Sequence, residues 1–214
     1  MTPQELLNKG AHELRVDLSI EQVNSIFLFL TELDKWNRTI NLTAIRDGRE
    51  VIIKHVLDSL SYLRGFDAVA GLRLLDMGSG AGFPAIPLKI ARPEIAVTLV
   101  ESVKKKASFL RHIVRTVKLK GIEVMDKRTE ELPAACLAAY DVVTARAFAN
   151  MDLALTTGRP FLKPGGQIVL SRGPEETIGE KKLARAGVLL KKRVELTLPH
   201  SEFKRVIWVL ERTA

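Results

Sequence analysis

Three alternating glycines follow an apolar segment that ends in an acidic residue. The segment reads LDMGSGAGFP over residues 75–84, with Gly78, Gly80 and Gly82 after Asp76. Glycine lets the backbone adopt positive φ and lets a ligand approach the main chain closely. The free N–H groups of a following helix would face such a ligand. The spacing therefore predicts a strand-to-helix turn that binds a nucleoside-containing cofactor, with a tight turn that binds nothing as the alternative.

The glycine spacing also separates two kinds of cofactor. A dinucleotide fingerprint reads G-x-G-x-x-G, whereas here Phe83 occupies the place of the third glycine and glycine falls at position 82. G-x-G-x-G after an acidic strand end is typical of S-adenosylmethionine enzymes. Glu101, at the end of the next apolar segment, can accept hydrogen bonds from both ribose hydroxyls, or it can be a neighbour of a helix N-cap. The turn therefore favours S-adenosylmethionine over NAD.

The elements that must position this turn alternate between strands and helices. We predict strands at residues 72–77, 95–102, 122–125, 140–145 and 167–171, and helices at 81–91, 104–121, around 152 and at 175–187. Such alternation predicts parallel strands joined by right-handed crossovers. Two consecutive strands at 188–199 and 202–210 predict a terminal antiparallel hairpin, which is the topology of class I methyltransferases. The expected fold is α/β and Rossmann-like, with a mostly parallel seven-stranded sheet that ends in that hairpin.

Three helices are predicted ahead of the sheet. Two begin with capping boxes and the third with an acidic cap: Thr2 with Glu5, Ser19 with Gln22, and Asp47 with Glu50. The second helix, over 20–36, places apolar residues on one face: Val23, Ile26, Phe27, Leu30 and Leu33. We therefore expect a small helical N-terminal extension over residues 1–65, packed on the core, and a methyltransferase domain over 66–214.

Net charge is unevenly distributed along the chain. Residues 1–70 carry eight Lys and Arg against ten Asp and Glu, a net of −2, whereas residues 71–214 carry 25 against 15, a net of +10. A basic surface beside a reaction site suits a polyanionic substrate such as nucleic acid, and solubility is the alternative reason for it.

Other features of the composition exclude whole classes of protein. No apolar run approaches the ~20 residues that a membrane span needs, and the N-terminus lacks the regions of a signal peptide. Cys136 is the single cysteine, so no intrachain disulfide can form, which fits a reducing cytoplasm. The four histidines match no metal-ligand spacing. We expect a cytoplasmic monomer with neither a metal ion nor a membrane partner.

Six motifs occur in a fixed order between residues 28 and 170: WNRTINLTAIRD, HVLDSL, LDMGSGAGFPAIPLKI, ES-x-x-KK-x-x-FL, KRTEEL and TARAFA. In these motifs the chain resembles the bacterial glucose-inhibited division protein B family, the 16S ribosomal RNA guanine-N7 methyltransferases. The resemblance implies S-adenosylmethionine as the methyl donor. It implies N7 of a specific guanine, in 16S rRNA or the small ribosomal subunit, as the acceptor.

The resemblance also implies cofactor-binding positions beside the turn glycine Gly80: Gly78, Phe83, Glu101, Thr129, Glu130 and Arg146. A helix N-cap is the alternative role for Thr129. Arg146 ends an apolar strand, so it needs an anionic partner. The candidates are the cofactor carboxylate, an RNA phosphate and Glu130.

The segment TARAFA lacks the Asn/Asp-Pro-Pro-aromatic motif of enzymes that methylate exocyclic amines. This argues for a ring nitrogen such as guanine N7, whose lone pair can attack without losing a proton. We therefore assign no general base and expect catalysis by proximity and alignment. The deep major groove of A-form RNA hides N7, so a loop or splayed base is the expected target.

Polar residues available for RNA contact are Asn41, His55, Asp58, Lys104, Lys105 and Arg172. Each also has an ordinary alternative, a solvated surface for the cations and a satisfied, partly buried site for His55. Trp36 can stack on a base or belong to the core. Two other functions stay open, a methyltransferase for small molecules or proteins and an RNA-binding assembly module without turnover.

Overall fold

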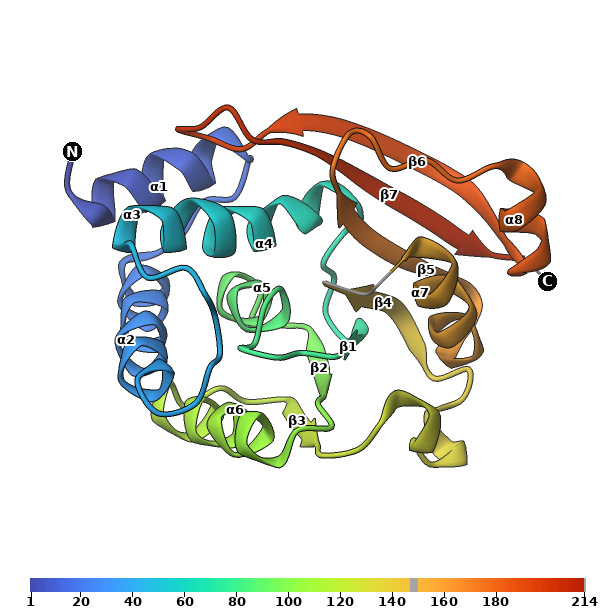
Figure 1. Ribbon diagram of the computed structural model, residues 1–214, viewed down its shortest axis with the longest axis horizontal. Helices are drawn as coiled ribbons and strands as arrows, with labels where there is room; N and C mark the ends of the chain where they lie inside the picture. The colour runs from blue at the N-terminus through green and yellow to red at the C-terminus, as the bar shows by residue number, and fades with distance from the viewer. Residues whose placement is uncertain (147–149, 214) are drawn as a thin grey trace.

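A single sheet runs through the computed structural model, which describes residues 1–146 and 150–213. Within these residues it has seven strands in the order β3-β2-β1-β4-β5-β7-β6 (Figure 1). They are β1 (Arg73–Met77), β2 (Ala96–Val100), β3 (Ile122–Met125), β4 (Tyr140–Ala145), β5 (Leu162–Arg172), β6 (Val188–Thr197) and β7 (Lys204–Arg212). Strands β1 to β5 are parallel, and β7 is antiparallel to both β5 and β6. The predicted sheet and its terminal hairpin are confirmed.

The helices follow the predicted caps. They are α1 (Pro3–Glu13), α2 (Ile20–Asn37), α3 (Gly48–Val51), α4 (Asp58–Ser61), α5 (Ala85–Ala91), α6 (Lys104–Thr116), α7 (Met151–Gly158) and α8 (Glu180–Arg185). Both capping boxes form, and the Asp47 side chain accepts a hydrogen bond from the Glu50 N–H at 2.8 Å. A π-helical segment (Ile52–Leu57) joins α3 to α4, so residues 48–61 run as one continuous helix.

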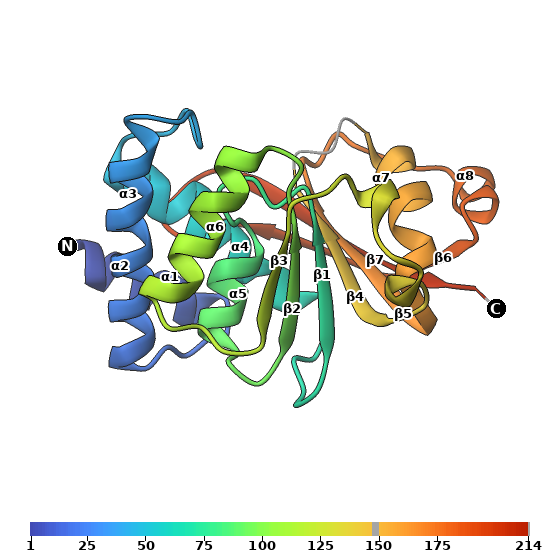
Figure 2. The same cartoon turned by 90° about the horizontal axis from the view of Figure 1, so that it is seen from below.

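Helices cover both faces of the sheet (Figure 2). The residues of α1, α2, α4, α5 and α6 pack on one face, and those of α7 and α8 on the other. The first layer forms one continuous apolar cluster, in which Leu7 of α1, Phe29 of α2 and Leu57 lie with Ile86 and Phe109. The N-terminal helices therefore complete the core over the sheet.

The structure shortens several predicted helices and changes one helical face. Helix α5 begins at Ala85 instead of near 81, because the intervening Gly82 has a positive φ of 89°. Lys118, with φ of 57°, ends the helical backbone that was predicted to reach 121. The helix predicted over 175–187 is limited to α8. On α2 the buried face includes Phe29, whereas Phe27 and Leu30 are half-buried.

The register of the parallel strands brings three segments to one edge of the sheet. Met77 of β1 lies opposite Val100 of β2 and Ala145 of β4. The residues that follow, at positions 78, 101 and 146, therefore emerge side by side. No helix within the described residues is long and apolar enough to cross a bilayer.

Candidate functional site

The glycines in the turn after β1, residues 78–84, have different roles. Gly78, Gly80 and Gly82 have φ of 67°, 56° and 89°. A Cβ on Gly80 would meet nothing closer than the Gly78 carbonyl at 3.8 Å, whereas one on Gly82 would lie 2.6 Å from Ile86 Cγ1. Gly80 therefore leaves room for a ligand along the backbone, and Gly82 is required for packing.

Glu101 joins the end of β2 to this turn. Its side chain is 6% exposed, and its two carboxylate oxygens accept backbone N–H groups from Gly80 at 2.8 Å and Val103 at 2.7 Å. The Ser79 N–H donates to the Val100 carbonyl at 2.9 Å, which is a second hydrogen bond between the turn and the end of β2. A carboxylate has about four lone-pair sites, so Glu101 keeps capacity for ribose hydroxyls while it anchors the turn.

Asp76, the acidic residue at the end of β1, is fully buried behind the turn. Its Oδ1 accepts a hydrogen bond from Thr144 Oγ1 at 2.9 Å, while Oδ2 has no partner among the described residues. Burial raises the pKa of Asp76 to about 7, against the hydrogen bond from Thr144 that lowers it. Ser79 Oγ donates to the Asp76 main-chain carbonyl at 3.0 Å. The sequence marked Asp76 as a strand end and not as a site residue; its isolated charge in an apolar strand was the available signal.

Phe83 lies between the turn and the N-terminal helices. Its ring stacks on His55 with 4.7 Å between centroids and contacts Phe29 at 5.2 Å. The side chain is 5% exposed, so it belongs to the core. Any contact of Phe83 with a cofactor would use its backbone or the exposed edge of the ring.

His55 is held in one tautomer. Arg146 Nη2 can only donate, and it lies 2.9 Å from His55 Nδ1, whereas the Lys54 carbonyl, an acceptor, lies 3.2 Å from the same atom. The tautomer is assigned from the shorter contact, with Nδ1 as the acceptor. Nε2 then carries the proton and donates to Thr43 Oγ1 at 2.7 Å. Burial, and secondly the charge of Arg146, lower the pKa of His55 to about 4. The imidazole is therefore neutral, which matches the alternative of a satisfied, buried histidine.

Arg146 follows β4 and points toward the N-terminal helices. Its Nη2 donates to the Lys54 carbonyl at 2.7 Å and lies 3.4 Å from Asp58 Oδ2. The carboxylate that pairs with Arg146 is therefore Asp58, and Glu130, the internal partner considered from the sequence, does not form this pair. Arg146 Nη1 is buried without a hydrogen-bond partner in the described part of the chain.

Asp58 connects three elements at this edge. It is 3% exposed, and its Oδ1 accepts hydrogen bonds from Arg205 Nε of β7 at 2.9 Å and Ser171 Oγ of β5 at 3.3 Å. Arg205 was missed from the sequence, although it follows Lys204 at the start of a strand. The network leaves Asp58 little surface for direct contact with RNA.

The KRTEEL segment lies beyond the end of β3. Thr129 is buried and begins a 3-10 turn over Thr129–Glu131, whereas Glu130 is exposed. The cap of this turn is Arg128, so the alternative of Thr129 as an N-cap is not what the structure has. The last three residues of the TARAFA motif, 147–149, lie outside the described residues.

Three of the remaining RNA candidates lie on the surface, and the fourth, Arg172, has a side chain that is only 10% exposed. Asn41 is exposed in the loop after α2, and Lys104 and Lys105 are exposed at the start of α6. Arg172, at the end of β5, forms an ion pair with Glu176 at 3.7 Å. The structure does not bring these side chains together with the buried network.

The segment that begins at Trp36 has an internal role. The Trp36 ring packs on Phe109 and His112 of α6, at centroid distances of 5.6 and 5.3 Å. Asn37 is buried, and its amide both donates to and accepts from the backbone of Thr43. Trp36 therefore contributes to the core, and Asn37 shapes the loop that holds His55.

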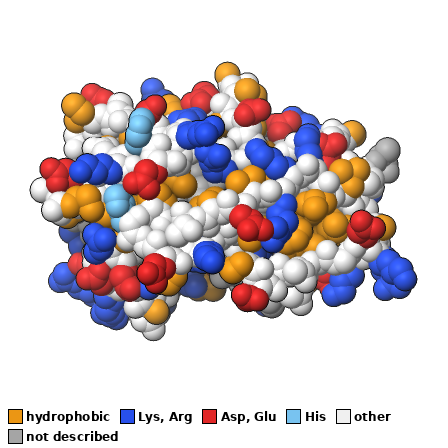
Figure 3. Space-filling model, turned by 90° about the horizontal axis from the view of Figure 1, so that it is seen from above, with side chains coloured by type: hydrophobic (Ala, Val, Ile, Leu, Met, Phe, Trp, Pro, Cys, Tyr) orange, Lys and Arg blue, Asp and Glu red, His pale blue; other side chains and the backbone are white. Residues whose placement is uncertain are grey.

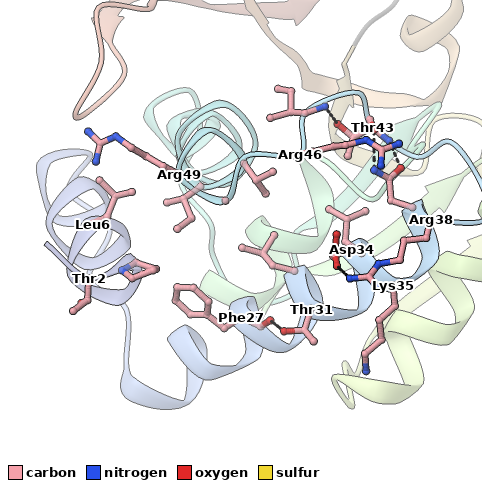
Figure 4. Close-up of a pocket in the computed structure, with 18 of the residues that line it drawn as sticks. Thr2, Leu6, Phe27, Thr31, Asp34, Lys35, Arg38, Thr43, Arg46 and Arg49 are labelled. Carbon is pink, nitrogen blue, oxygen red and sulfur yellow. Dashed lines mark hydrogen bonds and ion pairs between the residues drawn. The ribbon is translucent and has the colours of Figure 1, made fainter.

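A cavity of about 710 Å³ opens between α1, α2 and residues 43–52 (Figure 4). Apolar side chains such as Leu6 and Phe27 line it, and Arg38, Arg46 and Arg49 lie at its rim. It is built from the N-terminal helices and not from the strand ends, so it is distinct from the glycine turn. No cluster of three His, Cys, Asp or Glu suited to a metal ion occurs within residues 1–146 and 150–213.

Comparisons with known proteins match the chain over most of its length. The family model described as GidB, rRNA small subunit methyltransferase G, matches residues 22–207. The Ribosomal RNA small subunit methyltransferase G of Geobacter sp. (strain M21) is 43% identical, with 98% of this chain and 97% of that protein covered. The protein of the same name from Syntrophotalea carbinolica is 40% identical, with 98% and 96% covered.

Solved structures share the fold at low identity. The crystal structure of the [4+2]-cyclase SpnF has a TM-score of 0.62 at 15% identity, covering 93% of this chain and 98% of its own. That of M. jannaschii TYW2 in complex with AdoMet has a TM-score of 0.54 at 16% identity, covering 71% and 74%.

Proposed function

The chain belongs to the rRNA small subunit methyltransferase G family, and on that premise we propose that it transfers a methyl group from S-adenosylmethionine to N7 of a guanine in 16S ribosomal RNA. The observation that carries the proposal is the family match over residues 22–207, which spans the glycine turn and, from residue 22 of α2 onward, the helices that hold His55 and Asp58. The substrate is RNA of the small ribosomal subunit. We further propose that the chain works as a monomer in the cytoplasm.

The residues at the strand ends fit the cofactor. Gly80 leaves open backbone, Glu101 keeps lone pairs beside it, and both Asp76 Oδ2 and Arg146 Nη1 are buried polar atoms without a partner in the described chain. The Glu101 and Asp76 carboxylates can accept hydrogen bonds from the hydroxyl and ammonium groups of a ligand, and Arg146 can donate to its carboxylate. The proposed binding residues are Gly78, Gly80, Phe83, Glu101, Thr129, Glu130 and Arg146, with Asp76 added.

When bound, S-adenosylmethionine supplies a methyl group activated by its sulfonium. Guanine N7 has an in-plane lone pair, so this chain needs no residue that removes a proton. The protein instead holds the two reactants in line and excludes water, which can contribute several kcal/mol to the barrier reduction. His55 and Asp58 contribute by positioning Arg146, His55 through a hydrogen bond and Asp58 through an ion pair.

RNA contacts are proposed for three exposed residues and for Arg172, whose side chain is 10% exposed. Lys104 and Lys105 at the start of α6, Asn41 and Arg172 are the candidates that the sequence named. His55 and Asp58, named with them, are buried in the network, and we propose that they position other groups.

The test supplies labelled S-adenosylmethionine and small ribosomal subunits that lack the modification. Label should appear in 16S rRNA, and borohydride with aniline should cleave the strand at the modified guanine. Label in an exocyclic amine, or in protein, would contradict the proposal. Cofactor binding without transfer to any ribosomal particle would favour a non-catalytic assembly role.

A further inference from the structure

A second cavity, of about 790 Å³, is lined by none of the residues of the glycine turn. Its basic lining comes from four separate segments: Arg15 after α1, Arg64 before β1, Arg92 after α5, and Lys191 and Lys192 of β6. The face that carries α1 and the β6–β7 hairpin shows Lys and Arg side chains near its middle (Figure 3). Leu14, Val16, Leu63 and Val209 are among the apolar residues between them.

The positive charge of this basic cavity is not balanced internally. Among the residues the structure describes, Arg15, Arg64 and Arg92 form no ion pair with a carboxylate, and Lys192 Nζ donates to the Arg64 carbonyl at 2.9 Å. Lys191 is paired with Glu211, and Asp67 is the one acidic residue in the lining. Like charges gathered in a concave site repel one another and raise the local concentration of anions.

Arginine at such a site indicates a phosphate ligand. The guanidinium presents five donors in a planar fork that matches phosphate oxygens. Three such side chains line the cavity without a carboxylate partner, although Arg92 Nη1 donates to the Ala91 carbonyl at 2.9 Å and Asp67 is in the same lining. The apolar residues between them can hold a sugar or base. The chemistry therefore selects an anion rich in phosphate.

The basic cavity and the candidate site share no lining residue. On β7, Val209 lines the cavity, whereas Arg205, four residues earlier, holds Asp58 at the candidate site. At about 3.4 Å per residue, these two positions are roughly 14 Å apart. A ligand that reaches both must be larger than one nucleotide.

We propose that this basic cavity binds backbone phosphates of the RNA substrate, at a site separate from the one that holds the reacting guanine. The inference rests on the proposed function, because it takes the phosphate from the same RNA. A free polyphosphate or nucleotide presents the same phosphate groups, and stabilisation by tripolyphosphate distinguishes it from RNA.

The experiment compares two double variants of the full chain. Arg64→Gln/Arg92→Gln removes two charges from the cavity, and Lys181→Gln/Arg185→Gln removes two from exposed positions on α8 as the matched control. Binding to unmethylated small subunits is measured over a series of salt concentrations. S-adenosylmethionine affinity and thermal stability are measured in parallel, to verify folding.

The cavity variant should lower the slope of log K against log salt by about 1.4 to 1.8, since each phosphate contact contributes about 0.7 to 0.9. The control should change the slope by less than about half as much. Cofactor affinity and melting temperature should match those of the wild type. If the double variant does not fold, Arg15→Gln, at an exposed side chain, should lower the slope by about 0.7 to 0.9.

Equal slopes for the wild type and the cavity variant would overturn the proposal, as would equal losses in both double variants. Tripolyphosphate that stabilises the wild type but not the cavity variant, with an unchanged RNA slope, would assign the cavity to a free anion and also overturn it. The proposed function fails separately, if the wild type transfers no label, because binding is measured without turnover.

Discussion

His55 is the residue whose chemistry the fold constrains most. It lies between a donor, Arg146, and an acceptor, Thr43, and the contact in which Nδ1 accepts from Arg146 requires the neutral ring. Protonation would place a cation beside Arg146 in a buried site. Protonation of His55 is therefore expected to break its contact with Arg146.

The expected effect is a loss of stability in acid. The folded pKa of His55, about 4, lies below the unfolded value of 6.5, so the unfolded chain binds more protons between these values. The free energy of unfolding should fall as pH decreases from 6.5 to 4. In His55→Gln this part of the loss, up to about 3 kcal/mol, should be absent. Urea unfolding at pH 7 and pH 4.5 measures it; parallel losses in both proteins would contradict the assignment.

The two glycines of the turn should respond differently to alanine. Gly80→Ala places a Cβ in open space at a positive φ, which costs about 1 to 2 kcal/mol and fills the backbone approach. We expect its S-adenosylmethionine affinity to fall at least about tenfold while it remains folded. Gly82→Ala forces a Cβ against Ile86 and should cost more stability, about 3 kcal/mol. Calorimetric titration and thermal unfolding distinguish the two, and equal effects would refute the separation of roles.

At the scale of elements, Asp58 ties α4 to β7 through Arg205. Breaking a buried pair leaves an uncompensated charge, which typically costs about 3 to 5 kcal/mol. Asp58→Asn and Arg205→Gln should each destabilise the fold, and the double variant should lose less than the sum by about 1 to 3 kcal/mol. Chemical unfolding of the four proteins measures the coupling. Strict additivity would mean that the contact does not join these elements.

The helices and strands could largely be predicted because their signals are local. The capping residues Thr2 and Ser19 act within four positions, and each predicted strand carries its own apolar run. The start of α5 could not be predicted, since only the folded turn shows that the glycines adopt positive φ. The π-helical segment carried no recognised signal.

The partners within the site depend on distant residues, so the sequence could name candidates but not contacts. The Asp58–Arg205 pair spans 147 positions, and the Arg146–Asp58 pair spans 88. Arg146 was expected to need an anion, and which anion was decided by the packing of the N-terminal helices on the sheet. His55 was assigned to RNA on its position in a motif, whereas its burial became evident only with Phe83 beside it.

At the scale of the whole molecule, we propose that residues 1–65 are an extension and not an independent domain. Their apolar residues, such as Leu7 and Phe29, share one cluster with Leu74 of β1 and Leu88 of α5. A domain needs its own core, and removing half of this cluster exposes the rest.

A chain that begins at residue 66 should therefore fail to fold cooperatively. Circular dichroism during heating should show no sharp transition, and the protein should precipitate at the concentrations that the full chain tolerates. A truncated chain with a cooperative transition and retained S-adenosylmethionine binding would instead establish residues 66–214 as a self-sufficient domain.

Strand β7 fixes the distance between the candidate site and the basic cavity. Its alternate residues Arg205, Ile207 and Val209 lie on one face; Arg205 holds Asp58 at the candidate site, and Val209 lines the basic cavity. At about 3.4 Å per residue Arg205 and Val209 are roughly 14 Å apart, and pairing within the sheet keeps this distance constant. An RNA that fills both places must present a guanine and a phosphate at the matching separation. The enzyme would then select its target by the distance between a guanine and a phosphate in a folded ribosomal particle. Short RNAs with the right bases would be left unmethylated.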